Sequence, residues 1–148
     1  MARVTLLDVN VLVALFDPDH VHHDLAHDWF ADQRTSGWAT CAMTESGFIR
    51  IVSNPKYQAD PMRPSAAASQ LQKFCASGHH QYWTGMPSLR DDAVFALGAA
   101  RGHRQITDVC LLGLAKTKSG ALATFDRTIP LVAVKGARPE HLAIITPD

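Results

Sequence analysis

A short apolar run near the N-terminus stops abruptly at a carboxylate, and this junction constrains the fold more than any other feature. Residues 4–7 predict a buried strand, and Asp8 and Asn10 then open an apolar helix over residues 11–16. In open α/β sheets, ligands bind just outside the carboxyl ends of the strands. Asp8 or Asn10 is equally suited to capping the helix, so this stretch alone does not distinguish a ligand site from a cap.

Strand and helix patterns alternate along the rest of the chain. Such alternation argues for an α/β fold, with a mostly parallel sheet and helices on both faces. The length of 148 residues suits one domain, spanning residues 1–148, with a substantial core. Further strands are predicted at residues 38–41, 80–83, 121–124, 131–134 and 142–145, and further helices at 22–33, 45–52, 65–77, 90–101 and 108–115.

Four acids occupy junctions where a predicted strand ends or a predicted helix begins. Thr44 and Thr107 are the expected N-caps of two helices, so the acids after them fall in first turns, where the helix dipole favours them. The segment after Asp108 is apolar on nearly all sides and is expected to lie deep in the structure. A carboxylate there is costly unless it is paired or bound to a metal. The four acids are Asp8, Glu45, Asp108 and Asp126.

These acids are expected to converge, because the strands of a parallel sheet all end on one side. Clustered carboxylates repel one another, and some take up protons unless a cation neutralises them. Oxygen-only ligands suit Mg²⁺ or Mn²⁺. One or two such ions can activate a water and stabilise a leaving oxygen in phosphodiester hydrolysis.

Other catalytic patterns are missing from the sequence. It contains no Gly-x-Ser-x-Gly elbow, no phosphate-binding Gly-x-x-x-x-Gly-Lys loop, and no dinucleotide fingerprint after the first strand. The three cysteines are widely spaced in apolar contexts, which predicts buried free thiols in a reducing cytosol rather than disulfides or zinc ligands. His23 and His27 have the i, i+4 spacing of a metal-binding pair, but Asp24 and Asp28 alternate with them as on a solvated helix face.

The formal charge is zero, with 14 basic and 14 acidic residues, so bulk charge gives no sign of nucleic-acid binding. Residues 1–48 carry seven acids against two bases, whereas residues 49–148 carry seven acids against twelve bases. This split either produces a basic face able to meet phosphates or is intermixed by folding. No apolar run approaches the ~20 residues that span a bilayer, and no signal-peptide pattern is present. We therefore expect a cytoplasmic location and no contact with a membrane.

Four segments, taken together and in order, resemble the motif series of PIN domains, and within that family the VapC toxins of bacterial toxin–antitoxin pairs. Each segment is weak evidence alone, but the series covers the whole chain at the expected length. Val9 departs from the family, which often has Thr at that place. The segments are residues 6–12 (Leu-Leu-Asp-Val-Asn-Val-Leu), 44–45 (Thr-Glu), 106–115 (Ile-Thr-Asp-Val-Cys-Leu-Leu-Gly-Leu-Ala) and 124–127 (Thr-Phe-Asp-Arg).

The resemblance implies a metal-dependent endoribonuclease toxin with a three-layer α/β/α sandwich whose first strand is central. It places the Mg²⁺ or Mn²⁺ ligands and catalytic acids at Asp8, Glu45, Asp108 and Asp126, with Asn10 and Thr107 as supporting residues. It also implies a homodimer, a structured RNA substrate such as a transfer or ribosomal RNA, and a VapB-like cognate antitoxin that covers the acidic groove. Arg50 and Arg127 are candidate substrate contacts, although Arg50 is equally placed to pair with an acid. The loop at residues 54–64 varies in the family and is expected to affect target choice.

Three other functions are weighed against this one. A phosphohydrolase of the haloacid dehalogenase type needs a second Asp two residues after the first, where this chain has Asn10, which cannot transfer a proton. A non-catalytic PIN-like module that binds only RNA or a partner would be marked by substituted acids, and all four are present. A dimerisation module with capping acids alone is disfavoured by the buried context expected of Asp108.

Overall fold

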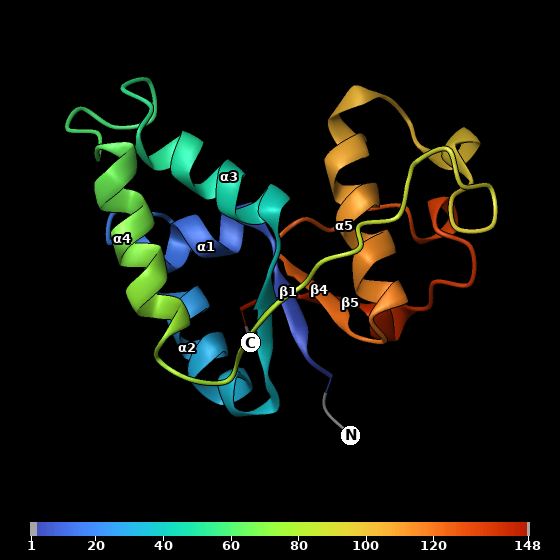
Figure 1. Ribbon diagram of the computed structural model, residues 1–148, viewed down its shortest axis with the longest axis horizontal. Coiled ribbons are helices and arrows are strands. Elements are labelled where there is room, and N and C mark those ends of the chain that lie inside the picture. The colour runs from blue at the N-terminus through green and yellow to red at the C-terminus, as the bar shows by residue number, and fades with distance from the viewer. Residues whose placement is uncertain (1–2, 148) are drawn as a thin grey trace.

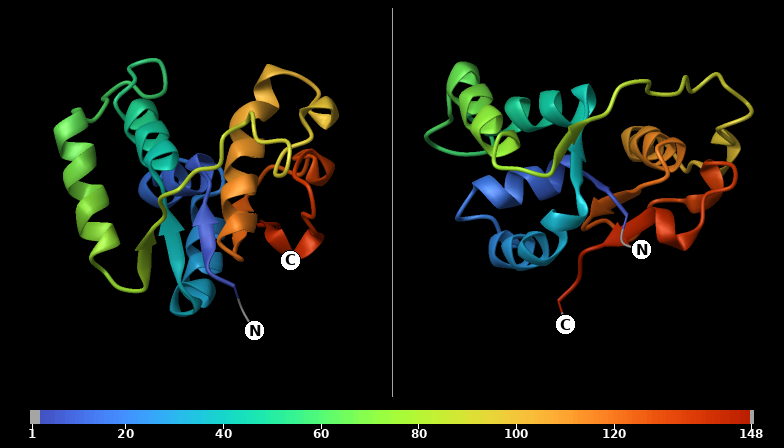
Figure 2. Two further views of the ribbon diagram at one scale, coloured as in Figure 1. Left: turned by 45° about the vertical axis from the view of Figure 1, so that its right-hand side comes forward. Right: turned by 60° about the horizontal axis from the view of Figure 1, so that its bottom comes forward.

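A five-stranded, all-parallel sheet forms the centre of the computed structural model, which describes residues 3–147. The strand order is β3-β2-β1-β4-β5, so the first strand is central, as expected. Helices cover both faces of the sheet (Figures 1 and 2). The predicted three-layer α/β/α sandwich is therefore confirmed. The strands are β1 (Thr5–Leu7), β2 (Trp38–Thr40), β3 (His80–Tyr82), β4 (Ala121–Thr124) and β5 (Leu142–Ile144).

Alternate residues of the central strands enter two separate apolar cores. Leu7 packs among the helices of one face and Leu6 packs against α5 on the other, and both side chains are fully buried. Helix α5 is buried from Val109 to Ala115, which confirms that it lies deep in the structure. The helices are α1 (Val9–Phe16), α2 (His23–Gln33), α3 (Ala42–Val52) and α4 (Pro64–Cys75) on one face and α5 (Ile106–Thr117) on the other.

Two histidines of α2 form hydrogen bonds with free carbonyl groups in the last turn of α1. His23 Nδ1 donates to the carbonyl oxygen of Ala14 at 2.6 Å, and His27 Nε2 donates to that of Leu15 at 2.7 Å. These carbonyls lie in the last turn of a helix, where no intrahelical partner remains. The pair spaced at i and i+4 therefore has a structural role in packing α2 against α1.

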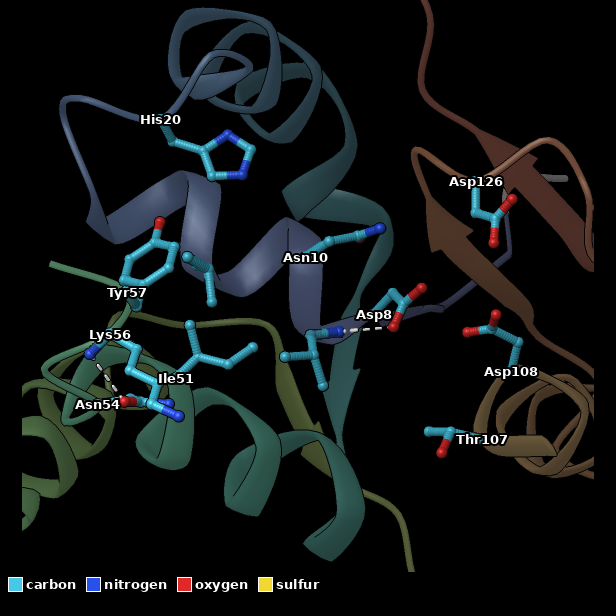
Figure 3. A pocket seen from close by; sticks show the side chains of 12 residues that line it. Asp8, Asn10, His20, Ile51, Asn54, Lys56, Tyr57, Thr107, Asp108 and Asp126 are labelled. Carbon is cyan, nitrogen blue, oxygen red and sulfur yellow. Dashed lines mark hydrogen bonds between the residues drawn. The ribbon is translucent and has the colours of Figure 1, made fainter. Parts of the chain in front are cut away.

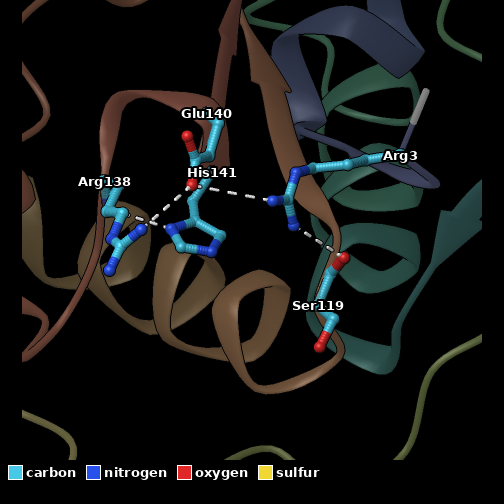
Figure 4. A network of polar contacts seen from close by, with 5 residues as sticks. All are labelled: Arg3, Ser119, Arg138, Glu140 and His141. Carbon is cyan, nitrogen blue, oxygen red and sulfur yellow. Dashed lines mark hydrogen bonds and ion pairs between the residues drawn. The ribbon is translucent and has the colours of Figure 1, made fainter. Parts of the chain in front are cut away.

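A polar network lies at the amino ends of the strands. Arg3, just before β1, donates to the carbonyl oxygen of Ser119 at 3.0 Å and lies 3.7 Å from the Glu140 carboxylate (Figure 4). Arg138 lies 3.9 Å from the same carboxylate, and His141 Nδ1 accepts from the Arg138 amide. Exposed ion pairs of this kind contribute about 1 kcal/mol or less, so the network ties loops together without stabilising the fold strongly.

The predicted helix at residues 90–101 is wrong. The segment forms turns and a short 3-10 helix (Leu97–Ala99), and Phe95 is only 3% exposed. The predicted strand at 131–134 is also wrong, because a 3-10 helix (Leu131–Ala133) stands there. The two segments pair with each other through a bridge between Phe95 and Val134, and Lys135 donates to the Val94 carbonyl at 2.8 Å. This tertiary pairing satisfies backbone groups that the predicted helix would have satisfied internally.

The predicted N-caps Thr44 and Thr107, and Ser65, which the pattern places as the cap of the helix at residues 65–77, are also wrong, because their helices begin earlier. Thr44 is the third residue of α3, where its hydroxyl accepts from the Cys41 amide at 3.0 Å. Thr107 is the second residue of α5, since a 3-10 turn leads into that helix. Ser65 is the second residue of α4, which begins at Pro64, a residue whose fixed φ favours the first helical position.

The expectation of buried free thiols is met only in part. Cys41, Cys75 and Cys110 are all free, but Cys75 is only half-buried, at the end of α4. Within residues 3–147, no helix combines the length and the apolar character that crossing a membrane requires.

The Phe95 ring packs directly against Gly113 of α5. Substitution of Gly113 therefore tests the packing of the irregular segment at residues 90–101. A Cβ at position 113 would lie 2.6 Å from two atoms of the Phe95 ring. We expect Gly113→Ala to lower the free energy of unfolding by about 1–2 kcal/mol, even though alanine favours a helix. Urea denaturation measures the change. Gly98→Ala is the control, because a Cβ there meets no atom within 4 Å; equal losses in the two variants would contradict this packing.

Candidate active site

Three of the four predicted acids line one pocket of about 620 Å³ at the carboxyl ends of β1 and β4 (Figure 3). Asp8 follows β1 directly, Asp126 stands two residues after β4, and Asp108 comes from the first turn of α5. Asn10 and Thr107, the predicted supporting residues, line the same pocket. The expected convergence is therefore confirmed for these three acids.

Asp8 is both a helix cap and a member of the pocket. Its Oδ1 accepts from the Val9 amide at 2.7 Å, and its Oδ2 accepts from the Thr124 hydroxyl at 2.7 Å. The residue is only 5% exposed. Burial raises the pKa of Asp8, and the nearby Asp126 carboxylate raises it further, against the lowering effect of the two hydrogen bonds.

Thr124 joins three of the pocket residues and was not among the predicted site residues. Its Oγ1 donates to Asp8, accepts from the Asp126 amide at 3.1 Å, and lies 3.5 Å from Asn10 Nδ2, which donates to it. The side chain is fully buried at the last position of β4. Its sequence signal, a polar residue that ends an apolar strand two positions before an acid, is weak.

Asp108 and Asp126 lie near each other on one side of the pocket, and Asp8 lies opposite them (Figure 3). Burial, together with the negative charges of Asp8 and Asp126, raises the pKa of Asp108 to about 7. A carboxylate with such a pKa holds a proton in weakly acidic solution when no cation is bound. The three acids therefore form a site in which like charges are held together by the fold.

The pocket residues fit a hard divalent cation. The donor atoms offered by the three acids, Asn10 and Thr107 are oxygens, which Mg²⁺ and Mn²⁺ prefer. A cation would relieve the repulsion that raises the pKa of Asp108. Asn10 Oδ1 adds an independent observation, because within residues 3–147 it is buried without a hydrogen-bond partner, on a residue that lines the pocket. A ligand in the pocket would satisfy this oxygen.

Glu45 does not line this pocket, so the predicted convergence of all four acids is not found. Because α3 begins at Ala42, Glu45 is its fourth residue and lies on the side facing α4. Its Oε2 accepts from the Thr40 hydroxyl at 2.7 Å. Glu45, Cys75 and His80 offer one donor atom each, and these three atoms lie within 4.8 Å of one another.

Residues from two loops complete the wall of the pocket opposite Asp108. His20 comes from the turn between α1 and α2, and Lys56 and Tyr57 come from the loop at 54–64. The Tyr57 hydroxyl donates to Asp17 Oδ2 at 2.6 Å, which lowers the pKa of Asp17, and burial together with this bond raises the pKa of Tyr57 to about 12. The loop at 54–64 was predicted to affect target choice, but none of these three residues was predicted.

The two predicted arginines lie outside the pocket but next to it. Arg50 is exposed and lines an adjoining pocket of about 300 Å³, which shares Val9, Ile51 and Asn54 with the acidic pocket. Arg127 is exposed and follows Asp126 directly. Both positions allow contact with a bound polymer that extends beyond the acidic pocket.

Comparisons with known proteins agree on one family. Residues 5–135 match the model of the PIN domain. Over 140 residues the chain is 41% identical to Ribonuclease VapC44 of Mycobacterium tuberculosis, which covers 95% of this chain and 98% of that protein. It is 39% identical to Ribonuclease VapC39 over 124 residues (84% and 89% covered) and 42% identical to Ribonuclease VapC38 over 123 residues (83% and 85%), both of the same organism.

The Thr124 hydroxyl is expected to orient the acids for cation binding. Thr124→Val removes the bond to Asp8 without changing the side-chain shape much, and we expect Mn²⁺ affinity to fall roughly 10- to 100-fold. Isothermal titration calorimetry measures the affinity. Thr124→Ser retains a hydroxyl and should bind nearly as well as the native protein. Equal affinities of the valine variant and the native protein would contradict this role.

The pH dependence of Mn²⁺ binding tests the state of Asp108. With a pKa of about 7, Asp108 holds a proton below that pH, and the cation must displace it. Affinity should therefore rise roughly tenfold per pH unit as the pH approaches 7, and level off above it. Asp108→Asn should bind more weakly and lose most of this dependence. The lower end of the test range, about pH 5.5, lies roughly one and a half units below the pKa. If the Mn²⁺ affinity of the native protein stays constant from there up to about pH 7, the assignment is refuted.

Proposed function

Because this chain belongs to the PIN-domain family, and within it to the VapC toxin ribonucleases, we propose that it cleaves structured RNA at the pocket of Asp8, Asp108 and Asp126. The observation that carries the proposal is the meeting of these three carboxylates, from three separate segments, in one open pocket. The expected substrate is a transfer RNA or the large ribosomal RNA. The cleaved bond is a phosphodiester of the RNA backbone.

Each acid has a defined place in the proposed chemistry. Asp8, Asp108 and Asp126 would hold a divalent cation, Mg²⁺ or Mn²⁺, with Asn10 and Thr107 beside it. When bound, such a cation supplies a nucleophilic water and neutralises charge on the scissile phosphate. Thr124 keeps the Asp8 carboxylate in one orientation through its hydrogen bond. Glu45 is included as the fourth acid on the family resemblance alone. In this structure its carboxylate accepts a hydrogen bond from Thr40 and does not line the pocket.

Basic residues on both sides of the pocket supply the RNA contacts. Arg50 and Lys56 lie on the α3 side, and Arg127 follows Asp126 on the other. Arg101, His103 and Arg104 line a further groove of about 350 Å³ at the start of α5. Phosphate contacts by such side chains position an RNA without reading its sequence. The acids alone repel RNA, so the cation should also strengthen RNA binding.

The proposal extends to two protein partners. A VapB-like antitoxin, expected from the toxin–antitoxin pairing of the family, would neutralise the enzyme by covering the acidic pocket with a C-terminal segment. A basic side chain of that segment would replace the cation's charge among the carboxylates. The toxin itself is proposed to act as a homodimer.

The phosphohydrolase alternative gains no support from the pocket. The residue two positions after Asp8 is Asn10, whose amide donates to Thr124 and cannot deliver a proton to a leaving group. The PIN-domain match over residues 5–135 argues against that alternative as well.

Cleavage of total bacterial RNA by the purified protein tests the proposal. With Mn²⁺ or Mg²⁺, discrete products should appear, and EDTA should abolish them. Asp8→Asn should lower the rate by roughly 100-fold or more, because it removes a charged ligand but retains a good helix cap. Asp24→Asn, at an acid of α2 outside the pocket, is the matched control and should cleave normally.

Two results would contradict the proposal. Products that persist in EDTA or in Asp8→Asn would place the activity elsewhere. Absence of products from protein freed of antitoxin by unfolding and refolding, with cation binding intact, would favour a member that binds RNA without cleaving it.

A further inference from the structure

A second group of metal-ligating side chains lies at the α4–β3 junction, outside the acidic pocket. The Glu45 cluster, as we call it, consists of Glu45 from α3, Cys75 from α4 and His80 from β3, with the Thr40 hydroxyl beside them. None of its members lines the acidic pocket. All three ligating residues are partly buried, so the cluster is within reach of solvent.

The local backbone brings Cys75 and His80 together. Cys75 is the last residue of α4 and His80 the first of β3. The short turn between them contains Gly78 at φ +115° and His79 at φ +64°, and glycine adopts such angles without strain. The turn folds the chain back sharply, and α3 then supplies Glu45 from the third side.

The spacing of the three donor atoms matches a tetrahedral ion after small side-chain movements. They lie within 4.8 Å of one another. Ligand atoms on a tetrahedral Zn²⁺ stand about 3.5 Å apart, given bonds of about 2.0–2.3 Å. Three protein ligands leave a fourth position for water, which is the arrangement of an accessible zinc site rather than a closed structural one.

The mixture of donor types distinguishes this cluster from the acidic pocket. One carboxylate, one thiol and one imidazole suit a borderline-soft ion such as Zn²⁺, whereas Mg²⁺ prefers oxygen alone. Surrounding contacts already orient two of the ligands. The Thr40 hydroxyl donates to Glu45 Oε2 at 2.7 Å, and the His80 ring packs on Trp38 with centroids 4.6 Å apart.

A metal would have to replace one existing contact. Thr40 Oγ1 lies 2.7 Å from His80 Nε2, and because the hydroxyl proton goes to Glu45, the imidazole donates in this pair. Coordination through Nε2 would move that proton to Nδ1 and leave the bond from Thr40 to Glu45 in place. The network is therefore compatible with metal entry and does not require it.

We propose that Glu45, Cys75 and His80 form a binding site for Zn²⁺ or a similar transition-metal ion, and that its occupation inhibits the enzyme. A bound ion fixes the Glu45 carboxylate on the side of α4 and β3. Glu45 is the fourth acid of the proposed catalytic set, so fixing it there withholds it from the acidic pocket. The inhibitory part rests on the proposed function, whereas the metal site itself does not.

Cobalt substitution tests the metal site without reference to activity. Co²⁺ added to the native protein, with excess Mg²⁺ to occupy the acidic pocket, should produce a thiolate-to-cobalt charge-transfer band that Zn²⁺ removes. Cys75→Ser should abolish the band, and His80→Gln should weaken Co²⁺ binding roughly 10- to 100-fold. His79→Asn, which changes the exposed neighbouring histidine and tolerates positive φ, is the matched control.

The spectra can either support or contradict the proposal that the Glu45 cluster binds a metal ion. A band that appears in the native protein, in His79→Asn and in Asp108→Asn, but not in Cys75→Ser, supports a site separate from the acidic pocket. Absence of the band from the native protein, or its persistence in folded Cys75→Ser, would overturn the site. Circular dichroism of each variant establishes that it is folded.

Inhibition is tested by titrating Zn²⁺ into the Mn²⁺-dependent cleavage reaction. Native protein should lose activity, and Cys75→Ser should require roughly tenfold more Zn²⁺ or more for the same loss. Equal inhibition of both would mean that Zn²⁺ acts at the acidic pocket, and would overturn the inhibitory role. Absence of cleavage by native protein before Zn²⁺ is added would instead count against the proposed function, while the cobalt spectra would still decide the metal site.

Discussion

Negative charge is crowded at the carboxyl ends of β1 and β4, and the surrounding structure must hold it there. Asp8 is nearly buried, and Asp108 stands close enough to Asp8 and Asp126 for its pKa to rise to about 7. Folding must therefore work against repulsion and desolvation at this point. The apolar cores on the two faces of the sheet, built from Leu6, Leu7 and their neighbours, supply the opposing stability.

The same scaffold explains why these acids do not separate to relieve their repulsion. Asp8 is fixed by its capping bond to Val9 and by Thr124, and Asp126 is held through its amide by the same threonine hydroxyl. Asp108 belongs to the first turn of a helix that is buried along most of its length. Groups held in this way are preorganised for a cation. Binding of the cation then relieves the repulsion among the three carboxylates, and this relief contributes to its affinity.

The alternation of strands and helices predicted the parallel sheet, and the acids that follow apolar runs predicted the three acids of the pocket, because both are local signals; the central position of the first strand came from the family resemblance. Local signals failed where long-range contacts decide the structure. The turns at residues 90–101 depend on Phe95 meeting Gly113 and Val134, and no local spacing reveals that pairing. The position of Glu45 depends on where α3 begins, and an error of three residues rotates a helix by most of a turn. Thr124 was missed because a single hydroxyl at the end of an apolar strand carries little signal of its own.

The attachment of the loop at residues 54–64 has a consequence for how this protein can diversify. The loop contributes Lys56 and Tyr57 to the pocket, yet its tip is joined to the turn after α1 by the Tyr57–Asp17 bond rather than by the sheet. We therefore expect substitutions in the loop to leave the strands and the three acids undisturbed. If this loop sets RNA preference, as the family resemblance implies, then RNA preference and catalytic chemistry are carried by separable parts of the chain, and duplicated copies of such a gene could acquire new targets while the cleavage machinery stays under unchanged selection.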